Sequence, residues 1–346
     1  MRWTIHLGLP KAASTSFQAS CSDAADAYFV GKLPRLGGSG SLPRYQSDED
    51  RTVLRTILPV CGPGHAPWQR LRAWVEDVER RARAAEHDHV LVSDEILSGV
   101  GFAGMEFGTT LEGVLAVLHR LLGDRATFIL IAREPAGWLR SYYSTRLKQG
   151  YSASFASFVT WATSFPYGSA LRGVDYRSIV RLAERPELDL RIWVFERFIS
   201  DAAYRETCLA ELGLDVSGQG LEHRNRRPDL RRLERLRAWN AVHARDWEAA
   251  TGAMRHPVIQ LLMLHDDWRA SLNDGDNPDE PLAAPALAAI NARNAYLADQ
   301  SGQSGPELSY EVPDDIRREL DRILVPGNRL LAAHLGTDLA PYGYVV

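Results

Sequence analysis

The chain has 346 residues, of which 45% are hydrophobic and 24% charged, and its formal net charge is -4. This length and composition allow a large buried core in one α/β domain or in two smaller ones. The slightly acidic balance excludes general nucleic-acid binding, so any basic patch must be local.

Four short apolar runs are predicted to be strands, at residues 2–8, 89–95, 126–134 and 189–196. The third run is continuously apolar, which suits a sheet that is covered on both faces. Helical patterns separate the four runs, and strands that alternate with helices indicate a parallel sheet. The predicted fold class is therefore α/β, a three-layer sandwich with a central parallel sheet.

The helices predicted between these strands cover residues 14–29, 67–86, 109–123 and about 136–149. In the second of them, Leu71, Trp74, Val75 and Val78 lie on one stripe at helical spacing. Three tryptophans, Trp74, Trp161 and Trp193, fall on apolar stripes and are expected in the core.

Residues 30–66 are rich in glycine and proline and are predicted to be irregular. From about residue 228 to residue 346 the pattern is mostly helical. Residues 273–286 are the best candidate for a linker, but they do not clearly divide the chain. We therefore expect residues 1–346 to form a single domain.

Three cysteines, Cys21, Cys61 and Cys208, have neither metal-site spacing nor a disulfide framework, which fits a reducing compartment. The N-terminus enters a strand-like run without the apolar stretch of a signal peptide, and no run of eighteen apolar residues follows. We expect a cytoplasmic protein without a membrane span. The many alanines and arginines suggest a GC-rich bacterial genome.

The loop after the first predicted strand has the composition of a phosphate site. In "HLGLPKAASTSF", residues 6–17, Gly8 leads to Pro10 and Lys11, and the hydroxyl residues come later, at positions 14 to 16. Nucleotidases instead place the lysine directly before Ser or Thr. Backbone N–H groups between a strand and a helix can hold a phosphate dianion. The same residues also occur in ordinary strand–turn–helix junctions.

A second segment, residues 132–150, follows the third predicted strand. Arg133 ends that strand, Pro135 suits the first turn of a helix, and Ser141 lies farther along it. Ligands of such sheets bind outside the carboxyl ends of the strands, so both segments point to one edge. Alternatively, the arginine caps a loop and the serine lies on a solvated helix face.

Together the two segments resemble the signatures of the PAPS-dependent sulfotransferases, where PAPS is adenosine 3'-phosphate 5'-phosphosulfate. The first family signature, G-x-P-K-[TS]-[GA]-[TS]-[TS], is matched by Gly8, Pro10, Lys11, Ser14 and Thr15. The second, R-[DNE]-P-x-x-x-x-x-S-x-Y, is matched by Arg133, Pro135, Ser141 and Tyr143. Ala12 departs from the usual Thr or Ser, and Trp138 stands where many relatives have Arg. The chain resembles bacterial members of the P-loop type, closer to the carbohydrate-type than to the cytosolic aryl-type enzymes.

The resemblance implies a P-loop nucleoside triphosphate hydrolase-like fold and transfer of a sulfuryl group from PAPS to a hydroxyl or amine. PAP is then the product, no metal is needed, and the acceptor is a carbohydrate, a lipid or a small metabolite. Lys11 is expected on the oxygen that bridges phosphorus and sulfur, where charge grows as the bond breaks. The residues expected around the 5'-phosphosulfate are Gly8, Pro10, Lys11, Ala12, Ala13, Ser14, Thr15 and Ser16. Arg133 and Ser141 are expected on the 3'-phosphate, for which arginine is well shaped.

Sulfuryl transfer usually needs a general base, and Glu95 is the favoured candidate, with Asp94 second. If the second predicted strand extends to residue 95, Ser93 and Glu95 share one face and Asp94 points the other way. Alternatively, a carboxylate here caps a helix or pairs with a basic residue. His6 lies in an apolar strand, where a histidine is more often a core residue, and His65 is a reserve candidate.

The densest basic run covers residues 222–239, in which Arg224, Arg226 and Arg227 are candidates for the 3'-phosphate or for an anionic acceptor. The run also reads as a solvated helix face balanced by acidic residues. Residues 30–66 are where we expect the acceptor pocket.

Two other functions stay open at this stage. A P-loop kinase or nucleotide hydrolase would want Mg²⁺ and a lysine beside Ser or Thr, and Asp94 could serve the metal. A non-catalytic PAP-binding protein would keep the nucleotide site without transfer. The sequence identifies neither the acceptor nor the oligomeric state.

Overall fold

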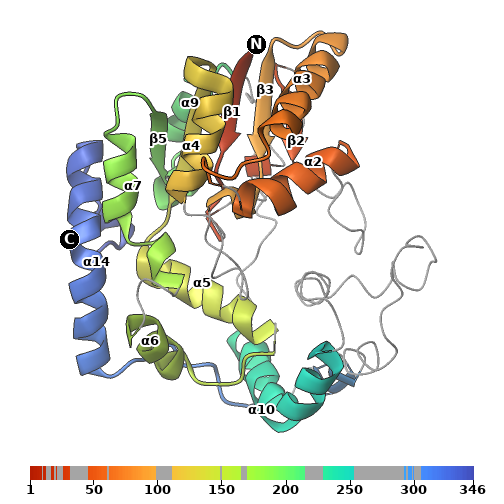
Figure 1. The fold of residues 1–346 in the computed structure, drawn as a ribbon. Helices are drawn as coiled ribbons and strands as arrows, with labels where there is room; N and C mark the ends of the chain where they lie inside the picture. Colours follow the sequence, from red (N-terminus) through yellow and green to blue (C-terminus); the bar gives the residue numbers. More distant parts are fainter. Residues whose placement is uncertain are drawn as a thin grey trace.

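The protein is described by a computed structural model, whose central element is a parallel sheet (Figure 1). The described residues are 1–9, 11–12, 17–18, 21, 26–31, 46–60, 62–98, 111–148, 150–164, 170–214, 229–252, 292–293, 295–297, 299 and 305–346. Five parallel strands pair in the order β2-β3-β1-β4-β5. Their bounds are Arg2–His6 (β1), Tyr28–Gly31 (β2), His89–Ser93 (β3), Ala126–Ala132 (β4) and Asp189–Val194 (β5).

The register brings the carboxyl ends of the strands to one edge. His6, the last residue of β1, is level with Ser93, the last residue of β3. Ala132 and Val194 end β4 and β5 as a pair. Gly31 ends β2 so close to β3 that a Cβ there would lie 2.2 Å from the main-chain oxygen of Ser93. The residues that follow these strands therefore share one edge of the sheet.

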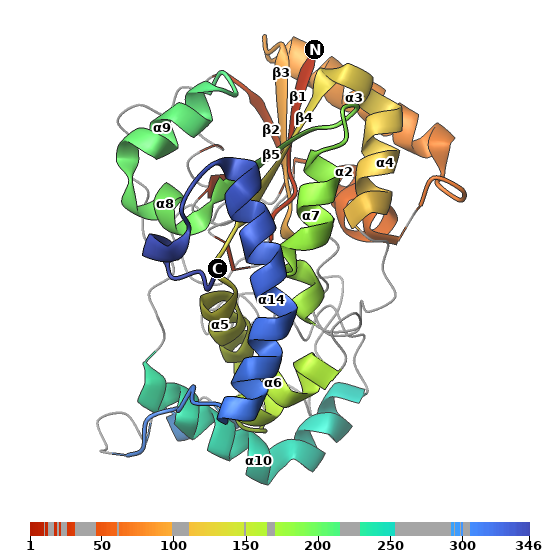
Figure 2. The same ribbon diagram turned by 90° about the vertical axis from the view of Figure 1, so that its left-hand side faces the viewer.

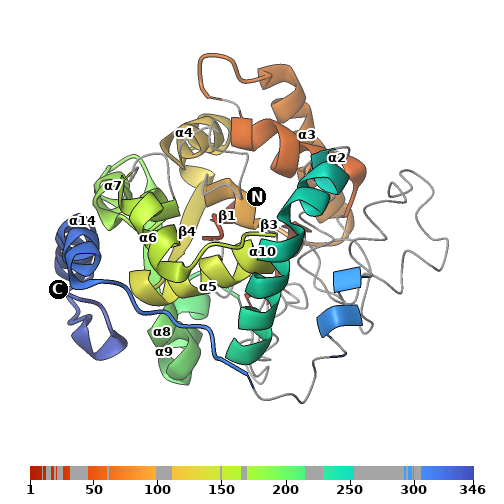
Figure 3. The same ribbon diagram turned by 90° about the horizontal axis from the view of Figure 1, so that it is seen from below.

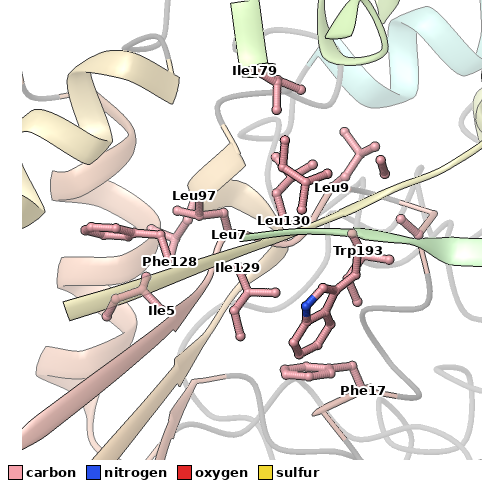
Figure 4. Close-up of a cluster of buried hydrophobic side chains, with 14 of the residues drawn as sticks. Ile5, Leu7, Leu9, Phe17, Leu97, Phe128, Ile129, Leu130, Ile179 and Trp193 are labelled. Carbon is pink, nitrogen blue, oxygen red and sulfur yellow. The ribbon is translucent and has the colours of Figure 1, made fainter. Parts of the chain in front are cut away.

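Helices cover both faces of the sheet, which confirms the predicted three-layer α/β class (Figure 2). On one face lie α3 (Trp68–Ala84), α4 (Leu111–Leu122) and α7 (Tyr176–Ala183). On the other face lie α8 (Phe195–Ser200) and α9 (Ala202–Ala210). The side chains between the layers are apolar, and Figure 4 shows a cluster from β1, β4 and β5 that includes Ile5, Phe128 and Trp193.

Four helices lie beyond or beside the carboxyl edge of the sheet (Figures 1 and 3). They are α5 (Pro135–Lys148), α6 (Phe155–Ser164), α10 (Leu230–Gly252) and α14 (Asp314–Leu335). Helix α10 packs on α5, and α14 packs on α7 and α6. The described part of the C-terminal portion is therefore mostly helical, as predicted. No helix among the described residues is long and apolar enough to cross a membrane.

The shorter elements are α2 (Asp48–Thr52), η1 (Val53–Ile57), η2 (Leu58–Val60), η3 (Glu95–Ser98), η4 (Gly123–Arg125), η5 (Ala170–Gly173) and η6 (Ala340–Tyr342). Two of the predictions above are therefore wrong in part. Strand β2 takes the end of the helix predicted at 14–29 and the start of the irregular stretch at 30–66. Within that stretch, residues 48–60 are helical, with the Ser47 hydroxyl accepting from the Asp50 N–H as an N-cap.

The tryptophan prediction is right for two residues and wrong for one. Trp74 and Trp193 are 2% and 3% exposed, whereas Trp161 is 43% exposed. Trp161 lies on α6 at the edge of its buried face, where its ring centre is 6.5 Å from that of the buried Phe158. The apolar stripe predicted for this helix therefore included one residue, Trp161, that is largely outside the core.

Candidate functional site

The loop that follows β1 is held by its apolar residues and bends sharply between them. Leu7, Leu9 and Ala12 are buried, and the Leu7 N–H donates to the Ile129 oxygen at 2.9 Å. Gly8 and Lys11 have φ angles of 39° and 67°. The left-handed region is costly for a residue that carries a Cβ, and such residues concentrate at functional sites. The loop thus holds the partly exposed Lys11 in a strained conformation.

Arg133 joins the second predicted segment to this loop. It comes directly after β4, and its guanidinium donates a hydrogen bond to the main-chain oxygen of Lys11, 122 positions away in the sequence. The guanidinium carbon lies 4.6 Å from the centre of the Phe195 ring, where the cation gains from the π face. Burial lowers the pKa of Arg133, and the carboxylates of Glu196 and Glu134 oppose that shift. Because burial disfavours the Arg133 cation, an anion bound beside it would stabilise the cation.

The N-terminus of α5 is already satisfied by protein groups. The Glu134 carboxylate accepts from the N–H groups of Ala136, at 2.6 Å, and Gly137. The Glu134 N–H in turn donates to Glu196 at 2.9 Å, and burial raises the pKa of Glu196. Because a carboxylate already occupies this helix end, an anion beside the N-terminus of α5 has to be held by side chains.

Ser141 and Tyr143 of the second signature have different surroundings. Ser141 is half-buried on α5, roughly 9 Å along the helix axis from Pro135 at the usual rise, and its hydroxyl has no partner among the described residues. Its side chain makes no described contact with Arg133. Tyr143 is buried, and its hydroxyl donates to the Ala153 oxygen at 2.7 Å. Tyr143 therefore fits a packing role, whereas Ser141 has a hydroxyl available to a ligand.

The end of β3 differs from the strand parity that the sequence predicted. β3 ends at Ser93 and η3 begins at Glu95, so the alternation of faces does not continue through Asp94 and Glu95. The Asp94 carboxylate is fully buried and accepts from Nε of Arg55 at 3.0 Å. Asp94 thus adopts the paired arrangement that the sequence left as an alternative. The backbone of Glu95 starts η3, and its side chain lies outside the described part.

A buried polar group connects β1, β3 and the segment after the loop. Nδ1 of His6 lies 2.8 Å from the Ser93 hydroxyl, which Gln18 also contacts at 3.3 Å. The Phe17 ring packs 4.3 Å from the imidazole. Burial lowers the pKa of His6 to about 3, against a weaker opposing effect of Asp94. His6 is therefore a neutral core residue, as the sequence indicated.

Several predicted site residues lie outside the described part of the chain. They are Pro10, Ala13, Ser14, Thr15, Ser16, Arg224, Arg226 and Arg227. The expected acceptor region is described only in part, because residues 32–45 and 61 are also outside it. The reserve candidate His65 is exposed, and its Nε2 accepts from the Gly62 N–H at 3.0 Å in a local turn.

Three contributors to this edge were missed by the sequence analysis: Arg55, Tyr176 and Glu196. Glu196 could have been found, because it is the last residue of a predicted strand. Arg55 and Tyr176 carry no local signal, since their partners Asp94 and Arg133 are 39 and 43 positions away. Among the described residues, no cluster of His, Cys, Asp and Glu has the arrangement of metal ligands.

No protein-family model matches the chain, and neither does any curated protein. Among solved structures, it is similar to the crystal structure of a sulfotransferase from Alicyclobacillus acidocaldarius. The sequence identity is 16% and the TM-score 0.40, and the match covers 74% of this chain and 97% of that chain. A likeness of this size carries no argument about activity, which has to rest on the site.

Proposed function

We propose that the chain is a sulfotransferase that moves a sulfuryl group from PAPS to a hydroxyl or amine of a carbohydrate, lipid or small-metabolite acceptor. The observation that carries the proposal is the hydrogen bond from the Arg133 guanidinium to the main-chain oxygen of Lys11. This hydrogen bond joins residues 6–17, which resemble the 5'-phosphosulfate signature, to residues 132–150, which resemble the 3'-phosphate signature. A nucleotide with anionic groups at two positions of one ribose needs two such sites side by side.

The donor fits the chemistry of the residues at this edge. The loop from Gly8 would face the phosphosulfate with backbone N–H groups, and the Lys11 ammonium would add positive charge. At the other end, Arg133 offers a guanidinium and Ser141 a hydroxyl without a described partner. These two side chains are needed because Glu134 already caps α5.

In the proposed reaction, the acceptor oxygen or nitrogen attacks sulfur in line with the bond to the bridging oxygen. The new bond to sulfur forms as the old sulfur–oxygen bond breaks, and PAP leaves with the electron pair. Lys11 stabilises the charge that develops on the bridging oxygen, so the step needs no metal. A carboxylate takes the acceptor proton. We assign that role to Glu95, because Asp94 is buried in an ion pair with Arg55.

The proposal is tested by comparing PAP with AMP, which lacks the 3'-phosphate. PAP at a hundredfold excess over its Kd should stabilise the native state by about 2.7 kcal/mol, seen as a rise in Tm, and AMP at the same concentration should do so far less. Equal shifts with the two nucleotides would contradict the assignment of Arg133 and Ser141.

Turnover separates the proposal from the two other functions. Radiolabelled PAPS should pass its sulfuryl group to an acceptor in an extract of the source cells, without Mg²⁺. Dependence of product formation on ATP and Mg²⁺ would instead indicate a kinase or hydrolase. Tight PAP binding without transfer to any acceptor would indicate a binding protein.

A further inference from the structure

Arg133 lies at the junction of β4 and α5, and a tyrosine hydroxyl holds its main chain. The last pair of the β4–β5 ladder is Ala132 with Val194, so the ladder ends before Arg133. The Tyr176 hydroxyl accepts from the Arg133 N–H at 2.9 Å and also donates to the Arg133 carbonyl oxygen. Burial raises the pKa of Tyr176, which keeps the phenol neutral and able to do both. One side chain thus satisfies both peptide groups of Arg133.

The next residue is held from the C-terminal end of the chain. The Glu134 N–H donates to one carboxylate oxygen of Glu196, and the Tyr344 hydroxyl donates to the other at 3.4 Å. Tyr344 is 3% exposed, although it lies two residues from the C-terminus. The side-chain amide of Asn328 on α14 donates to the Val345 oxygen at 2.8 Å, which fixes the tail to that helix.

Helix α14 also fixes Tyr176 through a close approach to α7. A Cβ at Gly327 of α14 would lie 2.9 Å from the Tyr176 nitrogen and 3.0 Å from Oδ1 of Asp175. Any larger residue at this position would clash with α7. Figures 1 and 2 show α14 and α7 side by side. The Asp175 carboxylate caps α7 by accepting from the Arg177 N–H. The backbone of Tyr176 is thus fixed on two sides.

We propose that Tyr176, with Glu196 and Tyr344, forms a C-terminal brace that positions Arg133 for the 3'-phosphate of the donor. The proposal rests on the proposed function. The direction of the Arg133 Cα–Cβ bond follows from the positions of the peptide groups on both sides of that Cα, and the brace fixes these peptide groups. A guanidinium that is held in place before binding loses less entropy when the phosphate arrives. Lys11 lies on a different loop, and Arg133 contacts its main-chain oxygen.

The test measures the affinities of PAP and AMP by isothermal titration calorimetry in the wild type and in Tyr176→Phe. The ratio of the two affinities reports the 3'-phosphate contact alone. We expect this ratio to fall by about tenfold in Tyr176→Phe, with AMP affinity changed by less than about twofold. In turnover, the KM for PAPS should rise while kcat changes little. A variant that is merely less stable would keep the ratio.

Tyr204→Phe is the matched control. The Tyr204 hydroxyl also accepts from a main-chain N–H at the carboxyl edge of the sheet, that of Val194 at 3.3 Å. Its described hydrogen bonds do not include Arg133 or Glu134. The ratio of PAP to AMP affinity should be unchanged in this variant. A tenfold fall there as well would mean that any loosening of the edge suffices, and it would overturn the brace.

Tyr344→Phe provides a second test that leaves Tyr176 in place. It removes only the contact of the tail with Glu196 and should lower the ratio by about threefold. If Tyr176→Phe does not fold, this variant decides, and an unchanged ratio overturns the inference. A wild type that binds PAP and AMP equally well refutes the proposed function itself. A wild type that prefers PAP, with the same preference in both variants, refutes the brace alone.

Discussion

Replacing Lys11 by glycine should make the fold more stable than replacing it by alanine, although both changes remove the ammonium group. Lys11 has a φ of 67°, in the left-handed region. That region costs roughly 1–2 kcal/mol for a residue with a Cβ and almost nothing for glycine. Glycine gains about 0.4–1 kcal/mol of extra freedom in the unfolded chain. The difference leaves Lys11→Gly more stable than Lys11→Ala by roughly 1 kcal/mol.

Urea unfolding with linear extrapolation measures this difference. The alanine variant is the control, because both variants lose every contact of the side chain beyond Cβ and differ only in backbone preference. Equal free energies of unfolding would mean that position 11 is not held in the left-handed region, and the argument from strain would fail.

The same two variants test the role of Lys11 in turnover. An ammonium that acts on charge developing in the transition state contributes to kcat more than to ground-state binding. Both variants should therefore lose turnover by a larger factor than they lose PAP affinity. Near-native kcat in either variant would remove Lys11 from the proposed chemistry.

Two further predictions concern the ends of β1 and β3. Burial lowers the pKa of His6 to about 3 in the folded protein, whereas the pKa in the unfolded chain is near 6.5. Between these two values only the unfolded chain binds the proton, so the free energy of unfolding falls as the pH drops. His6→Gln should remove up to about 1.4 kcal/mol per pH unit of that fall between about pH 6 and pH 4. The free energy of unfolding, measured in urea, should therefore depend less steeply on pH in the variant, and the same dependence in variant and wild type would refute the prediction. Glu95→Gln should lower kcat by about 10² to 10⁴, with PAP affinity retained. Asp94→Asn should mainly lower the free energy of unfolding. The loss should be roughly 3 kcal/mol or less, because the partner Arg55 is partly exposed. A stable but inactive Asp94→Asn would make Asp94 the base.

Four of the five strands were predictable because each contains a short, mainly apolar run that is separated from the next by a helical pattern. Strand β2 was not, since Tyr28–Gly31 has four residues and pairs, among the described strands, with β3 alone. So short a run has no readable period, and its position beside β3 is decided by packing. The helical residues 48–60 were hidden by the prolines and glycines around them. A capped first turn at Ser47 with three acidic residues after it was the available signal.

The meeting of Lys11 with Arg133 was predictable from topology, because residues that follow parallel strands reach the same edge. The predicted strand was too long by two residues, because β3 ends at Ser93, so strand alternation gives no basis for the face of Glu95. Asp94 could not be assigned from the sequence, since its partner Arg55 lies on η1, in a stretch without periodicity. Contacts of this kind are set by tertiary packing and cannot be predicted from a local sequence pattern.

The two proposed ends of the donor site differ in how the fold supports them. Lys11 is held by its own loop, in which Leu9 and Ala12 are buried, and by the hydrogen bond from Arg133 to its main-chain oxygen. Arg133 is held from a distance, by Tyr176 on α7 and by the tail that α14 anchors. Changes in the C-terminal segments should therefore act on donor affinity through the 3'-phosphate and leave the charge at the leaving oxygen intact. Variants at Lys11 should do the reverse, so combining Tyr344→Phe with Lys11→Ala should give additive free-energy changes if the two supports are independent.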